Sequence, residues 1–160
     1  MTYESARDLG RDLELSCDVV VVGSGASGAT VATELAEAGQ NVVVLEEGAR
    51  VDAGLHGKMR PSESLRHVWR DGGFTVAVGV GDTPVINVTM GRVVGGSSVV
   101  TGGVCFRTPD HVLDGGANEL GLTEYGARKM EPYFEKVEKH LHVETVTPDR
   151  WSRSTHLFAE

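Results

Sequence analysis

The chain has 160 residues, of which 23 are acidic and 15 are basic, so its net charge is -8 at pH 7. This length suits one domain, and the negative charge disfavours nucleic acid and anionic membranes as partners, because both require basic patches. Two cysteines, Cys17 and Cys105, are too few for a disulfide framework and indicate buried thiols in a reducing compartment; the alternative is that the two pair with each other.

The first segment, residues 1–16, is polar and charged and lacks the apolar core of a secretion signal. No later stretch of the sequence is long and apolar enough to span a membrane. We therefore expect a soluble, cytoplasmic protein in which residues 1–16 lead into the folded part.

A strand followed by a glycine turn begins that part. Val19 to Val22 form an uninterrupted β-branched run, which is typical of a parallel strand covered on both faces. The next residues have Gly-x-Gly-x-x-Gly spacing, which permits a tight turn, a close approach of pyrophosphate to the backbone, and close helix packing. The residues of this loop predicted to bind a dinucleotide are Gly23, Ser24, Gly25, Ala26, Ser27 and Gly28.

Helical periodicity continues from Ala29 to Ala38, with Val31, Ala32 and Leu35 on an apolar face and Gly39 as a left-handed stop. Residues 24–40 contain no Lys or Arg, so backbone amides and the helix dipole must meet the phosphate charge. This excludes a Walker-type phosphate loop, which needs its lysine.

A second buried strand is predicted over Asn41 to Leu45, and it ends at Glu46, whose carboxylate can accept hydrogen bonds from ribose hydroxyls. Glu47 is a competing candidate for this role. Because the two acids would repel a 2′-phosphate, an NADP-type ligand is disfavoured. The alternative interpretation of the glycines is an ordinary turn, but the strands, the helix and the spaced acid together favour a nucleotide site.

The region from 49 to 90 departs from the regular alternation of helix and strand that a nicotinamide dehydrogenase should continue. We expect a short helix around Ser64 to Arg70 and then an Asp-Gly-Gly turn. Two short strands, Phe74 to Val78 and Val85 to Val88, should form a hairpin.

A second glycine cluster runs from Gly91 to Pro109. Gly95 and Gly96 allow backbone close to a ligand, and the serines that follow can donate to anionic oxygens or cap a helical turn. Arg92 adds the only full positive charge expected nearby. A bulged strand with serine caps is the alternative that spacing alone leaves open.

Two helical pieces are predicted within Thr123 to Leu141, divided at Glu131-Pro132 with the proline at a first helical position. An apolar stripe on the second piece indicates core, and the charged residues between indicate a solvated face. The stripe comprises Tyr133, Phe134, Val137 and Leu141, and the charged face Glu135, Lys136, Glu138 and Lys139. None of the six histidines has metal-ligand spacing with other Cys, Asp or Glu, so no metal site is expected.

Several of these motifs together resemble the N-terminal portion of the GMC (glucose-methanol-choline) oxidoreductases. Gly91 to Ser98 is similar to the family's Gly-Arg-x-x-Gly-Gly-Ser-Ser signature, and Leu45-Glu46-x-Gly48 and Pro132 to Glu138 resemble two further family motifs. Val104 to Pro109 resembles bacterial, long-chain-alcohol-oxidase and cholesterol-oxidase-like members most. The Asn that usually follows the signature is Thr101 here, which keeps a hydrogen-bonding side chain but loses the amide and the length.

This resemblance implies an α/β, Rossmann-like FAD-binding fold with a parallel sheet, left incomplete because the chain resembles an N-terminal fragment. The implied parts are a lead-in (1–16), an FAD-binding portion with an inserted hairpin (17–110) and a helical region (111–160). Besides the first loop and Glu46, the resemblance implies FAD contacts from Arg92, Gly95, Gly96, Ser98, Thr101, Gly102 and Val104.

The function implied by the resemblance is oxidation of a small-molecule alcohol by hydride transfer to FAD, with an unidentified electron acceptor. The family's catalytic histidine matches nothing in this chain, so no catalytic residue is expected here and these residues alone should be inactive. A nicotinamide-dependent dehydrogenase with an unusual insertion, and a non-catalytic nucleotide-binding module that needs a partner chain, are the alternatives.

Overall fold

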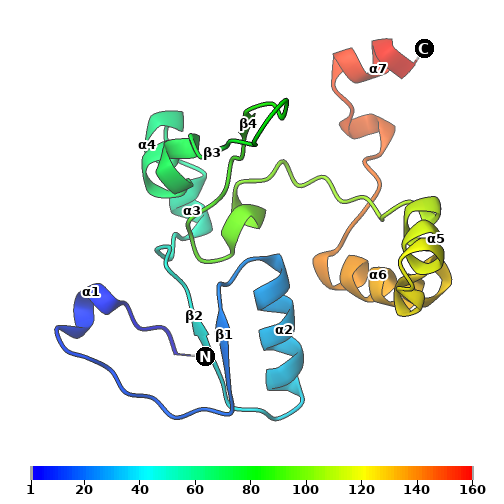
Figure 1. The fold of residues 1–160 in the computed structure, drawn as a ribbon. Helices are drawn as coiled ribbons and strands as arrows, with labels where there is room; N and C mark the ends of the chain where they lie inside the picture. The colour runs from blue at the N-terminus through cyan, green and yellow to red at the C-terminus, as the bar shows by residue number, and fades with distance from the viewer. Residues whose placement is uncertain (1, 160) are drawn as a thin grey trace. The chain divides into compact units, whose positions relative to one another are not determined.

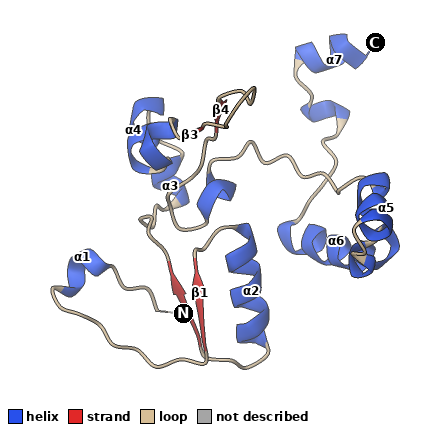
Figure 2. Cartoon of the chain, viewed as in Figure 1, coloured by secondary structure: helices blue, strands red, loops and turns tan. Residues whose placement is uncertain are grey.

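The computed structural model describes residues 2–159, which form two compact units divided between Gly103 and Val104 (Figures 1 and 2). The first unit contains α1 (Ala6–Leu9), β1 (Val19–Val22), α2 (Ala26–Glu37), β2 (Val42–Leu45), α3 (Ala53–His56), α4 (Pro61–His67), η1 (Arg70–Gly73), β3 (Val76–Ala77), β4 (Ile86–Asn87) and η2 (Gly96–Val99). The second contains α5 (Asp110–Glu119), η3 (Thr123–Tyr125), α6 (Ala127–Leu141), η4 (Pro148–Arg150) and α7 (Arg153–Ala159). The functional boundaries predicted after residues 16 and 110 stay predictions.

The first unit begins with the predicted strand–loop–helix–strand. β1 and β2 pair in parallel with Val19 opposite Val42, and α2 packs against both strands (Figure 1). Both predicted strands are confirmed, although β2 begins one residue later than expected. The helix begins at Ala26, earlier than expected, because the loop turns directly into it, and Gly39 ends it with φ +88°.

The sheet face opposite α2 is exposed, which differs from the expected strand covered on both sides. Val22 is 83% exposed and Val20 52%, whereas Val19 and Val21 are partly buried. Alternate residues of a strand point to opposite faces, so one face of β1 packs and the other has no cover among the described residues. The β-branched residues therefore give β1 two apolar faces, and this unit covers only one of them.

Glycines allow two close approaches that hold this unit together. A Cβ atom on Gly28 would lie 2.0 Å from the carbonyl oxygen of Gly23, so only glycine lets α2 pack onto the end of β1. A Cβ atom on Gly48 would lie 2.2 Å from the backbone nitrogen of Val93. The second contact brings the distant segment around Val93 against the chain that leaves β2.

The buried core of the first unit lies where residues 49, 69 and 91–93 meet. Val68 and Val93 are 0% and 1% exposed, and short β-bridges join Ala49 to Val93 and Trp69 to Gly91. The helix expected around Ser64 is α4, which ends at His67. The predicted hairpin also forms, as the antiparallel pair β3 and β4, but each strand has only two residues.

The helices of the second unit divide at a different residue from the one predicted. α6 runs through Pro132 without interruption, and the break lies at Gly126, whose φ and ψ of -63° and 154° are extended. Asp114 on α5 fixes this start, because its Oδ1 accepts a hydrogen bond from the Ala127 N–H at 3.0 Å. The predicted division at Glu131-Pro132 is therefore wrong.

The stripe expected to be core on α6 is mostly exposed: Tyr133 is 62% exposed, Leu141 60% and Val137 46%. Three of its residues, Phe134, Val137 and Leu141, line a hollow together with Cys105 and Phe106. The cysteine is exposed, which corrects the expectation of two buried thiols, and Cys17 is only partly buried. In residues 2–159, no helix has the length and apolar character needed to cross a membrane.

The charged face of α6 also differs from expectation at Glu138. Its two carboxylate oxygens accept hydrogen bonds from Nε and Nη2 of Arg107, both at 2.6 Å, and the guanidinium lies 5.8 Å from the centre of the Phe134 ring. The bond from Arg107 lowers the pKa of Glu138. Glu138 is thus an ion-pair partner of the loop before α5 as well as a solvated side chain.

Candidate functional site

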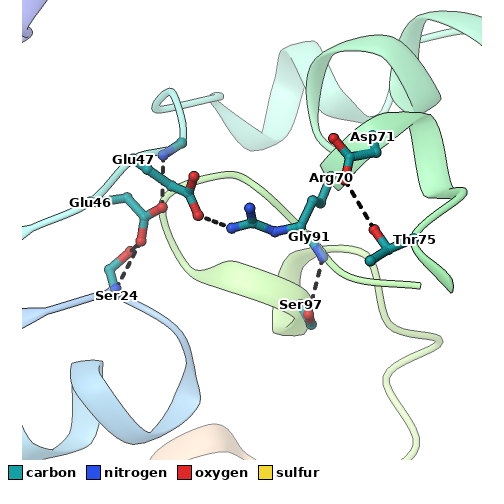
Figure 3. A network of polar contacts seen from close by, with 9 residues as sticks. Ser24, Glu46, Glu47, Arg70, Asp71, Thr75, Gly91 and Ser97 are labelled. Carbon is teal, nitrogen blue, oxygen red and sulfur yellow. Dashed lines mark hydrogen bonds and ion pairs between the residues drawn. The ribbon is translucent and has the colours of Figure 1, made fainter. Parts of the chain in front are cut away.

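Glu46, at the end of β2, bonds directly to the first glycine loop (Figure 3). Its Oε2 accepts hydrogen bonds from the backbone N–H of Ser24 at 2.8 Å and from the Ser24 hydroxyl at 2.7 Å. Its Oε1 accepts the N–H of Gly48 at 2.8 Å. The predicted carboxylate is therefore fixed at the carboxyl ends of β1 and β2, where open parallel sheets bind their ligands.

These contacts keep Glu46 ionised. Partial burial acts to raise its pKa, but the backbone bonds from Ser24 and Gly48, the Ser24 hydroxyl and the charge of Arg70 together lower the pKa below its ordinary value. Near neutral pH the side chain is therefore a carboxylate with acceptor oxygens only.

The second glycine cluster lies directly beside the first loop. The N–H of Gly95 donates a hydrogen bond of 2.9 Å to the Ser24 hydroxyl oxygen, and a Cβ atom on Gly96 would lie 2.8 Å from the Gly25 Cα. Both Gly95 and Gly96 have positive φ, at 99° and 61°. The two glycine-rich segments thus converge on one place, next to Glu46.

The N-terminus of α2 opens at the same place. Its N-cap is Gly25, no side chain caps it, and its first turn carries no acidic residue. A Cβ atom on Gly25 would meet nothing within 4 Å, so the backbone here faces open space. Free amides and the positive end of a 12-residue helix are suited to an anionic group such as a phosphate.

Arg70 is the cation that sequence reasoning missed. Its guanidinium pairs with the carboxylate of Glu47, and its charge also acts on Glu46 (Figure 3). Arg92, expected to be the only positive charge nearby, contributes its backbone N–H to the carbonyl of Val68 at 2.8 Å. No local sequence pattern indicates that Arg70 lies at this site. Its position depends on the β-bridge between Trp69 and Gly91, which are distant in the sequence.

The serines of the second cluster do not cap a helical turn as expected. Gly95 is the N-cap of η2 and no side chain bonds there. The Ser97 hydroxyl instead accepts the N–H of Gly91 at 3.0 Å, closing the segment on itself (Figure 3). The alternative, a bulged strand with serine caps, does not form either.

The remaining predicted contacts are less closely placed. Thr101 lines an open cavity of about 150 Å³ with His56, Ser64, Trp69, Val99 and Val100. Ser98 follows Ser97 within η2, and Gly102 lies just beyond this element, where an added Cβ atom would meet nothing within 4 Å. Val104 belongs to the second unit and is 69% exposed. Among residues 2–159, no group of three or more His, Cys, Asp or Glu side chains is placed to hold a metal ion.

Comparison with known proteins agrees with this arrangement. The family model described as GMC oxidoreductase matches residues 17–159. A GMC-type oxidoreductase of Mycobacterium tuberculosis is 38% identical over 143 residues, which are 89% of this chain and 22% of that protein. A long-chain-alcohol oxidase of Arabidopsis thaliana is 34% identical over 133 residues, 82% of this chain and 17% of that protein.

Among solved structures, formate oxidase of Aspergillus oryzae superimposes with a TM-score of 0.55 and 26% identity, over 73% of this chain and 21% of that one. This chain therefore spans about a fifth of the length of the relatives that it matches. The matched region includes the first loop, Glu46 and the second glycine cluster. On this match, the chain belongs to the GMC oxidoreductase family.

Proposed function

We propose that this chain forms the dinucleotide-binding part of an FAD-dependent oxidoreductase that oxidises an alcohol. One observation carries the proposal: Gly25 at the open N-terminus of α2, Gly96 of the second cluster and the ionised Glu46 converge within one small region. Family membership supports FAD over a nicotinamide cofactor, and so does the similar formate oxidase, a protein in which FAD undergoes modification.

The residues at this place fit the polar half of FAD. Backbone amides at the start of α2 would hold the pyrophosphate, because they lack side-chain partners and face open space. Glu46 would accept a ribose hydroxyl, since its lowered pKa keeps it ionised. Contacts to FAD from Arg92, Ser98, Thr101, Gly102 and Val104 rest on the family resemblance and remain part of the proposal.

In this proposal the residues of this chain bind the cofactor, and the cofactor supplies the redox chemistry. When bound, FAD would accept a hydride from the carbon of the alcohol. This chain's residues bind and orient the cofactor through amides, a carboxylate and close backbone contacts. The base that takes the hydroxyl proton is proposed to lie outside residues 2–159, because the family's catalytic histidine matches none of the six histidines in this sequence.

The substrate class is proposed from relatives. A long-chain-alcohol oxidase of Arabidopsis thaliana and a paromamine 6′-oxidase of Streptomyces fradiae, 30% identical over 141 residues, are among them. Both names describe oxidases, which supports a hydroxyl-bearing small molecule as substrate. The net charge of -8 gives no support to a polyanionic partner.

The decisive experiment substitutes Gly25 with alanine in the full chain. Because the added Cβ meets nothing and φ is -65°, the loss of folding stability should stay under about 1 kcal/mol, the cost of a poorer N-cap. The methyl group would occupy the space where a phosphate approaches, so FAD affinity should fall about tenfold or more. Affinity is measured by titrating apoprotein with FAD and following flavin fluorescence.

Gly54→Ala is the matched control, because its Cβ also meets open space and Gly54 lies in α3, away from the converging loops. It should leave both stability and FAD affinity unchanged. Unchanged FAD affinity in Gly25→Ala would contradict the proposed site. A purified full chain without visible flavin absorbance that binds a nicotinamide dinucleotide would favour the dehydrogenase alternative.

A further inference from the structure

Both hydrogen-bond donors of Ser24 are already used within the protein. The backbone N–H and the hydroxyl each donate to Oε2 of Glu46, at 2.8 and 2.7 Å. A hydroxyl carries a single proton, so a Ser24 side chain that donates to Glu46 has none left for a phosphate oxygen. Ser24 is also buried, with 9% of the residue's surface exposed.

The same hydroxyl is held from the other side. Its oxygen accepts the N–H of Gly95 at 2.9 Å, and Gly95 is 71 residues away in the sequence. The chain of bonds therefore runs from the second glycine cluster, through the Ser24 hydroxyl, to the carboxylate at the end of β2. A donor at one end and an acceptor at the other fix the direction in which the Ser24 proton points.

The hydrogen bonds within the protein leave one acceptor position on the Glu46 carboxylate free. An ionised carboxylate has about four lone-pair positions, two on each oxygen. The two bonds from Ser24 fill Oε2, and the Gly48 N–H takes one position on Oε1. One position, on Oε1, is left for a hydroxyl from outside the protein.

We propose that Ser24 is a positioning residue, which orients the Glu46 carboxylate so that one acceptor position on Oε1 faces a ribose hydroxyl, and that it does not contact the cofactor phosphates itself. This inference rests on the proposed function, since the ribose is that of FAD. It replaces the direct contact from Ser24 that the sequence predicts with an indirect one through Glu46.

A double-mutant cycle on the full chain tests the inference. Ser24→Ala should lower FAD affinity about tenfold, the lower end for loss of a hydrogen bond to a charged group, because Glu46 loses its fixed orientation. In a Glu46→Ala background the same substitution should change FAD affinity less than about twofold, since the side chain that Ser24 orients is absent. FAD itself is the titrant in all four proteins.

A second readout needs no cofactor. The hydrogen bond from the Ser24 hydroxyl is one of those that lower the pKa of Glu46. The melting temperature of the apoprotein, measured as a function of pH, falls at acid pH, and this acid limb should lie at higher pH in Ser24→Ala than in the wild type. Ser97→Ala is the matched control, because it also deletes a serine bond to a glycine N–H of this region but does not touch Glu46. It should leave the acid limb where it is.

The outcomes separate the two proposals. Equal loss of FAD affinity from Ser24→Ala in both backgrounds would show that Ser24 acts on the cofactor directly, and would overturn the inference while the proposed function stands. An unmoved acid limb in Ser24→Ala would overturn it as well. If the wild-type chain binds no FAD, the proposed function itself fails, and the inference fails with it.

Discussion

Gly96 lies so close to Gly25 that a Cβ atom on Gly96 would be 2.8 Å from the Gly25 Cα, well inside van der Waals contact. Gly96 also has a φ of +61°, a conformation that residues other than glycine rarely adopt. Two independent requirements therefore select glycine at this position. The contact joins the two glycine-rich segments around which the FAD site is proposed.

Substituting Gly96 with alanine should destabilise the chain. The positive φ and the overlap with Gly25 should together cost about 2 to 4 kcal/mol of unfolding free energy, measured by denaturant unfolding. Gly54→Ala, which meets no atom within 4 Å, should change the same quantity by less than about 1 kcal/mol. Equal stability of the two variants would show that the segments do not approach each other as described.

The stability of the chain should depend on the ionisation of Glu46. Because its folded pKa lies below the ordinary value of 4.5, the unfolded chain binds more protons in that window, and stability rises with pH there. The contribution of Glu46 is complete above about pH 4.5 and is lost as pH falls through the folded pKa.

Replacing Glu46 with Gln removes this titration. The variant should be less stable than the wild type at pH 7 and should lose less stability between about pH 5 and the acid limit, as followed by thermal unfolding at a series of about six pH values. Glu47→Gln is the control, because Glu47 is the neighbouring acid and pairs with Arg70 at an exposed position, whereas Glu46 accepts the loop bonds. Parallel acid limbs in wild type and Glu46→Gln would contradict the bonds from Ser24 and Gly48.

The start of α6 should depend on Asp114. Removing its carboxylate in Asp114→Ala leaves the Ala127 N–H without its partner, which should cost about 1 kcal/mol, the usual value of a helix cap. Asp114→Asn keeps an acceptor oxygen and should recover most of the loss. Thermal unfolding and hydrogen exchange of the first turn of α6 measure the effect, and identical exchange in all three proteins would count against the contact.

Local patterns in the sequence were sufficient to predict β1, the glycine loop, α2, β2 and the carboxylate at Glu46. In this part the β-branched runs, the Gly-x-Gly-x-x-Gly spacing and the terminal acid each act over a few residues. They also act in the same direction, which is why local reasoning succeeded.

What the sequence could not show are contacts between distant segments. The approach of Gly96 to Gly25, the bond from Gly95 to Ser24 and the position of Arg70 beside Glu47 all depend on the pairing of residues 49, 69 and 91–93. No periodicity encodes those pairings. Local patterns did not indicate the helix over Asp110–Glu119 for a different reason, because Gly115 and Gly116 within it are poor helix formers; only the family resemblance implied that this region is helical.

Pro132 is the residue at which the rule that proline begins a helix fails. Proline favours the first turn of a helix, yet here it lies inside α6, where it cannot donate a hydrogen bond to the carbonyl of Arg128. The helix starts earlier because the Oδ1 of Asp114 accepts a hydrogen bond from the N–H of Ala127. Tertiary contact therefore outweighs the local preference.

Replacing Pro132 with alanine should consequently stabilise the second unit. The restored backbone bond should contribute about 1 to 2 kcal/mol after the greater freedom of the unfolded chain is subtracted. Pro148→Ala is the matched control: this proline begins η4, where no N–H is needed, so its loss should leave stability unchanged or lower it by up to about 1 kcal/mol. A lower melting temperature for Pro132→Ala would mean that α6 does divide at Glu131-Pro132, as the sequence alone predicts.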